Sequence, residues 1–167
     1  MSDAYDLPPQ KAIELLGRLM LSWDGQWFLK TAEAFGVEKG VELNARTRFS
    51  FGRIELREFL RALGHPGATT VREATELVHA YHRLFLGGGM DAGFEVEGDT
   101  VTIRVTRCSP QEGSARAGLR TDTPCVACET VWDAWLGSAM PGSSWTTEIA
   151  ASMGRGAGAC KIVLKKI

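Results

Sequence analysis

Several features that would assign a function class at once are missing from this 167-residue sequence. Its 19 Lys and Arg are balanced by 20 Asp and Glu. There is no basic excess for phosphate contacts, so we expect no nucleic-acid partner. The same balance argues against a polybasic membrane anchor. No apolar run approaches the roughly 18 residues of a membrane span, so we expect no membrane partner.

A secretory leader is also missing from the start of the sequence. The stretch "MSDAYDLPPQ" has neither a basic region nor an apolar core. We therefore expect a cytoplasmic protein, in which the four cysteines are reduced thiols or metal ligands and not disulfides. No internal repeat is visible. A chain of this length can bury a sizeable core without metal or disulfides, so any metal site would serve function or local structure.

The first half of the chain has the periodicity of helices. A long first helix follows Pro8 and Pro9 and stops near Gly36, with apolar residues at spacings of three and four: Ile13, Leu16, Met20, Trp23 and Trp27. A second helix is predicted from Val37 to Leu63. A third begins at a capping box, with Thr69 or Thr70 as N-cap and Glu73 in the first turn, and ends at Gly87 to Gly89.

The second half changes character near Phe94. "FEVEGDTVTIRVT" predicts a hairpin that turns at Gly98-Asp99, and "SPQEGSARAGL" a short helix opened by a capping box at Ser109. A further helix is predicted with Thr123 as N-cap, then strands in "WTTEIAASM" and "ACKIVLKKI". The predicted fold is α+β: three helices in residues 1–90 pack on an antiparallel sheet from a strand-strand-helix-strand-strand unit in 91–167, in one compact domain.

All the cysteines lie in this second half, at element ends. Cys108 follows a strand, Cys125 and Cys128 share a face in the first turns of a helix, and Cys160 starts the last strand. Gathered together, they would suit zinc or an iron-sulfur cluster. A reactive thiol near the helix N-terminus and plain buried cysteines remain alternatives. Cys108 is out of phase with the alternating strand and faces inward only if the strand ends or bulges.

Other residues are candidates for a ligand pocket between the first and third helices and the sheet. His82 follows the apolar face of the third helix, whereas His79 does not. Trp23 and Trp27 are core residues by their spacing, with the floor of a pocket as the alternative. Asp24, beside Trp23 in an apolar stretch, indicates a wet cavity. We predict Trp23, Trp27 and His82 as pocket residues.

The order of elements and the ending "G-x-x-x-C-K-I-V-L" (Gly156 to Leu164) resemble the 4-vinyl reductase small-molecule-binding domain. The chain is also similar to the aminothiazoline-carboxylate hydrolase-like proteins, an uncharacterised family, which share that ending. Cys108, Cys125 and Cys160 match positions where such sequences tend to carry cysteine. Here "GAGAC" lacks the acidic residue usual before the last strand.

The resemblance implies a dimeric small-molecule-binding or sensing protein whose cysteines can hold metal. The family pattern does not include Cys128, but its place on the same helix face as Cys125 adds it to the predicted ligands, which are Cys108, Cys125, Cys128 and Cys160. One alternative is a hydrolase of the aminothiazoline-carboxylate type. In it Cys125 would be the nucleophile or a metal ligand, with His82 or Glu129 as base. A second alternative is an assembly module, a homodimer formed through the long helices. The sequence leaves open whether the protein is an enzyme, because a fold alone grants no activity.

Overall fold

Helices fill the first half of the chain and an antiparallel sheet dominates the second, which confirms the predicted α+β class. The computed structural model describes residues 6–86 and 89–167. Helix α1 (Pro9–Phe35) is followed by α2 (Val37–Leu63) and α3 (Val71–Phe85). Gly36 separates the first two helices with a φ of 87°, a backbone conformation that favours glycine. The predicted limits of α1 and α2 are confirmed.

The capping box predicted for α3 is present. The Thr70 hydroxyl accepts a hydrogen bond from the Glu73 N–H at 3.2 Å. The Glu73 carboxylate in turn accepts from the Thr69 N–H at 2.7 Å, one residue earlier than in the standard motif. The bond from Glu73 satisfies one of the N–H groups that a helix start leaves open. The glycines predicted to end this helix, Gly87 and Gly88, lie outside the described residues.

The sheet has the order β1-β2-β4-β3, and each neighbouring pair is antiparallel. Its strands are β1 (Met90–Glu97), β2 (Thr100–Cys108), β3 (Trp145–Ala151) and β4 (Cys160–Lys166). The predicted hairpin joins β1 to β2, and Gly98 takes a φ of 57° in its turn. Strand β1 begins at Met90, four residues before Phe94, where the sequence placed the change in character.

The two helices of the second half begin differently from the prediction. Helix α4 (Ser109–Arg116) has no side-chain cap, because β2 leads directly into it and Cys108 takes the N-cap position. Helix α5 (Cys125–Ala139) is preceded by Pro124 at the N-cap. Thr123 is not the cap, since its N–H closes a turn on the Arg120 carbonyl at 3.1 Å. A short 3-10 helix, η2 (Met153–Arg155), joins β3 to β4.

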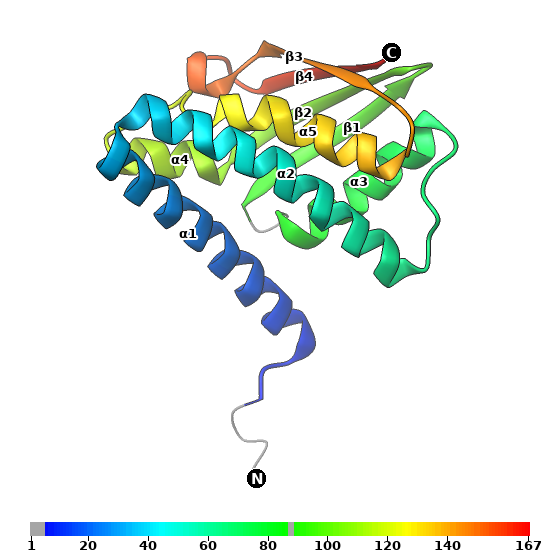
Figure 1. Cartoon of the computed structure of the whole chain (residues 1–167), viewed down its shortest axis with the longest axis horizontal. Coiled ribbons are helices and arrows are strands. Elements are labelled where there is room, and N and C mark those ends of the chain that lie inside the picture. The colour runs from blue at the N-terminus through cyan, green and yellow to red at the C-terminus, as the bar shows by residue number, and fades with distance from the viewer. Residues whose placement is uncertain (1–5, 87–88) are drawn as a thin grey trace.

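Helices α3 and α5 pack on one face of the sheet, and α2 packs along α5 (Figure 1). One hydrophobic core fills the space between these layers. It combines residues of the two predicted parts of the chain: Leu56, Val78, Ile103, Trp132, Trp135, Ile162 and Leu164. The opposite face of the sheet carries exposed charged residues such as Arg104 and Lys161.

Helix α1 projects from this body (Figure 1). None of its described residues is buried. Trp23 and Trp27 stack on each other with centroids 6.2 Å apart, yet they are 66% and 54% exposed. Their interpretation as core residues is corrected, because no element within residues 6–86 and 89–167 covers the apolar stripe of α1. Among the described helices, none is both long and apolar enough to cross a membrane.

Candidate functional site

A cavity of about 120 Å³ lies where α2, the start of α5 and the sheet meet. Most of its wall is apolar, and both the helices and the sheet contribute to it: Val105, Val131, Trp132, Ile149 and Ile162. Ligand sites in proteins are typically mostly apolar concavities with a few placed polar groups. This cavity is therefore the candidate functional site.

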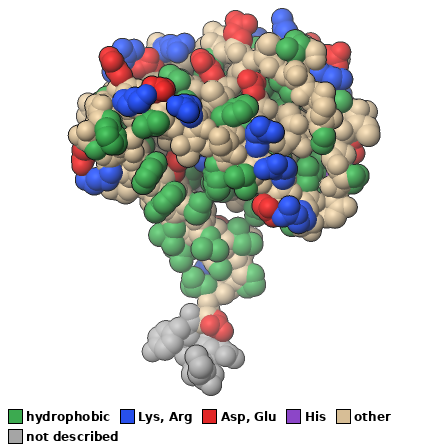
Figure 2. All heavy atoms as spheres, viewed as in Figure 1, with side chains coloured by type: hydrophobic (Ala, Val, Ile, Leu, Met, Phe, Trp, Pro, Cys, Tyr) green, Lys and Arg blue, Asp and Glu red, His purple; other side chains and the backbone are tan. Residues whose placement is uncertain are grey.

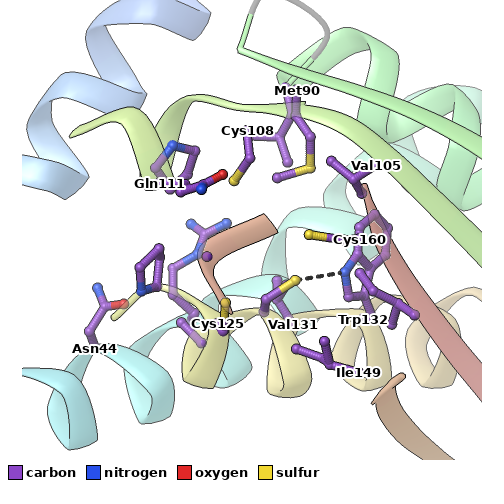
Figure 3. Close-up of a pocket in the computed structure, with 18 of the residues that line it drawn as sticks. Asn44, Met90, Val105, Cys108, Gln111, Cys125, Val131, Trp132, Ile149 and Cys160 are labelled. Atoms are coloured by element: carbon purple, nitrogen blue, oxygen red, sulfur yellow. Dashed lines mark hydrogen bonds between the residues drawn. The ribbon is translucent and has the colours of Figure 1, made fainter. Parts of the chain in front are cut away.

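All four cysteines line this cavity. Cys108 comes from the end of β2, Cys125 and Cys128 from the first turns of α5, and Cys160 from the start of β4. Figure 3 shows the labelled cysteines arranged around one space. Each cysteine is partly buried and forms no disulfide. The sequence left open whether these residues meet, and the fold brings them to one cavity.

A bulge in β2 explains how Cys108 reaches the cavity. Asp91 pairs with Arg107 but Ala92 pairs with Val105, so Thr106 is an extra residue on β2. Such a residue shifts the alternation of the strand by one position. Val105 is buried, the next two residues are exposed, and Cys108 turns inward again. This is the bulge that the sequence required for an inward-facing Cys108.

Three of the sulfur atoms contact neighbouring polar groups. Cys125 Sγ lies 3.3 Å from Ser152 Oγ. The Trp132 indole N–H donates to Cys128 Sγ at 3.1 Å, the contact dashed in Figure 3. The Met153 N–H donates to Cys160 Sγ at 3.3 Å. The 3-10 segment after β3 therefore helps to position two of the thiols.

Burial keeps two of the thiols protonated. It raises the pKa of Cys108 to about 11 and that of Cys128 to about 12. A reactive thiol near the start of α5 is one of the alternatives from the sequence, and burial opposes it at Cys128. Removing a thiolate from water costs more than the helix N-terminus returns. Cys108 and Cys128 are therefore neutral thiols at neutral pH and weak nucleophiles.

The predicted zinc or iron-sulfur site requires several thiolates around one ion. Among the described residues, no three His, Cys, Asp or Glu side chains are arranged to hold an ion. The four cysteines line the wall of the cavity. A metal held by Cys108, Cys125, Cys128 and Cys160 stays a prediction.

One end of the cavity is polar. Its polar end consists of Asp24 from α1, Asn44 and Arg48 from α2, and Gln111 from α4. Figure 3 shows Asn44 and Gln111 at the end away from Trp132 and Ile149. Burial raises the pKa of Asp24, while the nearby Arg48 charge opposes that rise. The cavity thus has an apolar body and a polar end, and Asp24, which the sequence associated with a cavity, belongs to that end.

Arg48 forms a loose ion pair beneath this polar end. Its Nη1 lies 3.7 Å from Glu55 Oε1, and the Arg48 side chain is 12% exposed. The other carboxylate oxygen of Glu55 accepts from the Trp135 indole N–H at 3.2 Å. Burial raises the pKa of Glu55, and the Arg48 charge partly offsets this. The carboxylate thus links α2 to α5 behind the cavity wall.

The predicted pocket residues lie elsewhere. Trp23 and Trp27 are on the exposed face of α1 and do not line the cavity. His82 is 1% exposed. Its ring stacks on Trp132 with centroids 5.9 Å apart and meets Phe94 edge-on at 5.7 Å. His82 therefore lies one layer behind the wall, in contact with a lining residue.

The predicted catalytic residues are not brought together at the cavity. Of Cys125, Glu129 and His82, Cys125 lines the cavity and the other two do not. Neither ring nitrogen of His82 has a hydrogen-bond partner among the described residues. Burial lowers its pKa to about 4. The described contacts therefore provide no base for the Cys125 thiol, whose polar neighbour is Ser152.

Sequence reasoning missed Asn44, Arg48 and Gln111 at the polar end. Asn44 and Arg48 are one helical turn apart, on the face of α2 that continues through Gly52 and Glu55 toward α5. A Cβ on Gly52 would lie 3.2 Å from Trp135, so the two helices are close here. The combination of a small residue and spaced polar groups on one face could have identified these residues.

Comparisons with known proteins identify the fold. No protein-family model matches the chain, and no curated protein sequence matches it. The crystal structure of a trafficking protein particle complex subunit 3 from Naegleria fowleri, covalently bound to palmitic acid, is similar with a TM-score of 0.62. The match covers 95% of this chain and 96% of that chain at 13% sequence identity. At this identity the likeness establishes the shared fold alone.

Proposed function

We propose that this protein binds a small, mainly apolar molecule in the cavity lined by the four cysteines. The observation that carries the proposal is the cavity itself, whose wall combines Val131, Trp132 and Ile162 with a polar end. Its volume of about 120 Å³ is close to the roughly 150 Å³ of an engineered apolar cavity that binds benzene. An apolar group of about six carbon atoms has a suitable size.

The similar structure supports this function. The Naegleria subunit is covalently bound to palmitic acid, so a protein of this fold can carry an apolar ligand. In the present protein the cysteines supply soft, polarizable atoms that suit an apolar ligand. Binding without turnover is favoured over hydrolysis, because Glu129 and His82 do not line the cavity beside Cys125.

Calorimetric titration with 1-hexanol tests the proposal. Hexanol is neutral and has an apolar body of the required size. Val131→Phe places a larger side chain in the cavity wall and should abolish binding. The matched control is Val163→Phe, on the opposite face of β4 from the buried Ile162. Absence of hexanol binding to the wild-type protein, or binding that survives Val131→Phe in a folded variant, would contradict the proposal.

A narrower version of this proposal follows from the resemblance seen in the sequence. In that version the protein is a sensing domain of the 4-vinyl reductase type, and its cysteines bind a metal. Zinc binding would have to displace protons from Cys108 and Cys128, so it would strengthen with rising pH. Elemental analysis of purified protein at pH 6 and pH 8 measures this directly. If the metal content does not change when all four cysteines are replaced by serine, the prediction that these cysteines bind the metal is contradicted.

We also propose that the chain assembles through α1, most simply as a homodimer. Figure 2 shows hydrophobic side chains gathered on the helix that projects from the body. They include large exposed residues: Ile13, Leu16, Leu19, Met20, Trp23, Trp27 and Phe35. Contiguous apolar patches of this kind mark interaction surfaces. The similar Naegleria protein is a subunit of a complex.

Light scattering coupled to size-exclusion chromatography tests the assembly. We expect the wild-type protein to be a dimer and the double variant Trp23→Glu/Trp27→Glu to be a monomer, since charges on the apolar face cannot be desolvated. Leu84→Glu, at another exposed apolar residue, is the matched control and should remain dimeric. A monomeric wild-type protein at 100 µM (on the order of the highest useful concentration) would contradict self-association.

A further inference from the structure

Arg48 presents unused hydrogen-bond donors to the cavity. Its guanidinium has five N–H donors. Among the described residues its polar contact is the ion pair with Glu55, at 3.7 Å. That separation is too long for a hydrogen bond, and Glu55 Oε1 has no hydrogen-bond partner among the described residues. The remaining contact is the face of Phe85, with the guanidinium carbon 5.9 Å from the ring centre.

Unused donors on a largely buried side chain cost stability, because most of the Arg48 side chain is removed from bulk water. Arg48 lines the cavity, so a molecule inside it can reach these donors. Two N–H groups of an arginine match the two oxygens of a carboxylate in one plane. Arg48 therefore lacks a hydrogen-bond acceptor, and the carboxylate of a carboxylic acid would provide one with two oxygens in one plane.

The nearby acidic groups do not prevent an anion from binding. Glu55 lies behind the wall and does not line the cavity. Asp24 lines it, but burial raises the pKa of its carboxyl. Burial thus disfavours the charged form of Asp24, which is the form that would repel a bound carboxylate. Asn44 and Gln111 at the same end each offer an amide donor.

From these contacts we infer that the ligand is a monocarboxylic acid whose carboxylate binds Arg48, while its apolar body lies against Trp132, Ile149 and Ile162. The inference rests on the proposed binding function and names the chemical class of the ligand. The opposite positions of Asn44 and Trp132 in the cavity fix the direction in which the acid lies (Figure 3). No bond forms or breaks.

Hexanoate and 1-hexanol form a matched pair for the test, because they share a six-carbon chain and differ at the head group. At pH 7 we expect calorimetry to give hexanoate at least about tenfold tighter binding than hexanol, the size of effect that a hydrogen bond to a charged group produces. Arg48→Gln should remove the preference, so that hexanoate binds no more tightly than hexanol does to the same variant. Arg53→Gln, exposed on the same helix, is the control and should bind both as the wild type does.

Replacing Arg48 alone leaves Glu55 buried without its partner, so the single variant is paired with Arg48→Gln/Glu55→Gln, which keeps the charge balanced. The same loss of preference for the acid in the double variant supports the inference. If hexanoate and hexanol bind the wild-type protein with equal affinity, the inference that the ligand is a carboxylic acid is overturned. The proposed binding function then still stands. A preference for hexanoate that survives in the folded double variant overturns the role of Arg48. If neither compound binds, the proposed function itself fails.

Discussion

Two tryptophan pairs at helical spacing lie in opposite surroundings. Trp132 and Trp135 on α5 are 1% and 0% exposed, whereas Trp23 and Trp27 on α1 are 66% and 54% exposed. Helix α5 has α2 on one side and the sheet on the other, while α1 has α2 along part of its length and projects beyond it. Periodicity thus identifies an apolar face, but another element of the same chain decides whether that face becomes core.

The largest expected difference is in stability. Trp135→Ala removes a fully buried side chain and its hydrogen bond to Glu55, so it should lower the free energy of unfolding by about 3–5 kcal/mol. Trp23→Ala should change it by less than about 0.5 kcal/mol in a dilute monomeric sample. Urea unfolding followed by circular dichroism measures both.

Concentration provides the control for this pair. If α1 mediates assembly, Trp23→Ala loses stability relative to the wild type only at concentrations where the wild type is a dimer. Trp135→Ala should lose the same amount at every concentration. Equal losses for the two variants in dilute samples would mean that α1 packs on the body of its own chain.

The next effect concerns His82, which is buried beside Trp132, and its dependence on pH. The folded pKa of about 4 lies below the usual 6.5, so the unfolded chain binds the proton more readily. The stabilisation is complete above pH 6.5 and is lost as the pH falls toward 4. The difference corresponds to about 3 kcal/mol. Besides burial, His79 lowers this pKa and Asp91 raises it.

Unfolding of the wild type and His82→Leu across pH 4 to 7 isolates this contribution, since acidic groups titrate in both proteins. The wild type should lose stability more steeply below pH 6.5 than the variant. Parallel pH profiles would contradict the lowered pKa of His82. They would mean that a hydrogen-bond partner, such as a bound water, stabilises the protonated ring in the folded protein.

Much of the fold could be predicted from local chemistry. The limits of α2, the cap at Thr70 and the hairpin turn at Gly98 follow from periodicity, a side-chain acceptor and a residue free to take a positive φ. Each of these depends on residues that are near one another in the sequence. Alternation along β2 likewise indicates which face packs on the helices.

The candidate site depends on contacts between distant residues, so less of it could be predicted. The sequence identified the four cysteines as a set, and the bulge at Thr106 that aims Cys108 inward is visible only once β1 is paired. Arg48 carries no local mark that separates it from the exposed arginines of α2. Arg48 is distinguished by its two acidic neighbours in the folded protein. Asp24 comes from α1, and Glu55 lies two turns further along α2.

The start of α3 offers a smaller test of how helix ends differ. Thr70 caps α3 with a hydrogen bond to the Glu73 N–H, while α1 has no side-chain cap. Thr70→Ala should therefore cost about 1 kcal/mol of unfolding free energy. Thr69→Ala, at the neighbouring residue whose hydroxyl is 3.3 Å from the Glu73 carboxylate, should cost less. A larger loss for Thr69→Ala would mean that the carboxylate, and not the Thr70 hydroxyl, holds the helix start.

The smallest expected effect returns to the two helical regions. A Cβ on Gly25 of α1 would meet nothing within 4 Å, whereas one on Gly52 of α2 would lie 3.2 Å from Trp135 and Ala134. Alanine forms a helix better than glycine by about 0.5–1 kcal/mol. Gly25→Ala should therefore stabilise the chain by that amount in urea unfolding. Gly52→Ala should gain less or lose stability, because the packed ring must shift. Gly25→Ala could instead weaken the dimer in light scattering. That result would mean that the backbone of the partner approaches α1 at Gly25, and this close packing would explain why the residue is glycine.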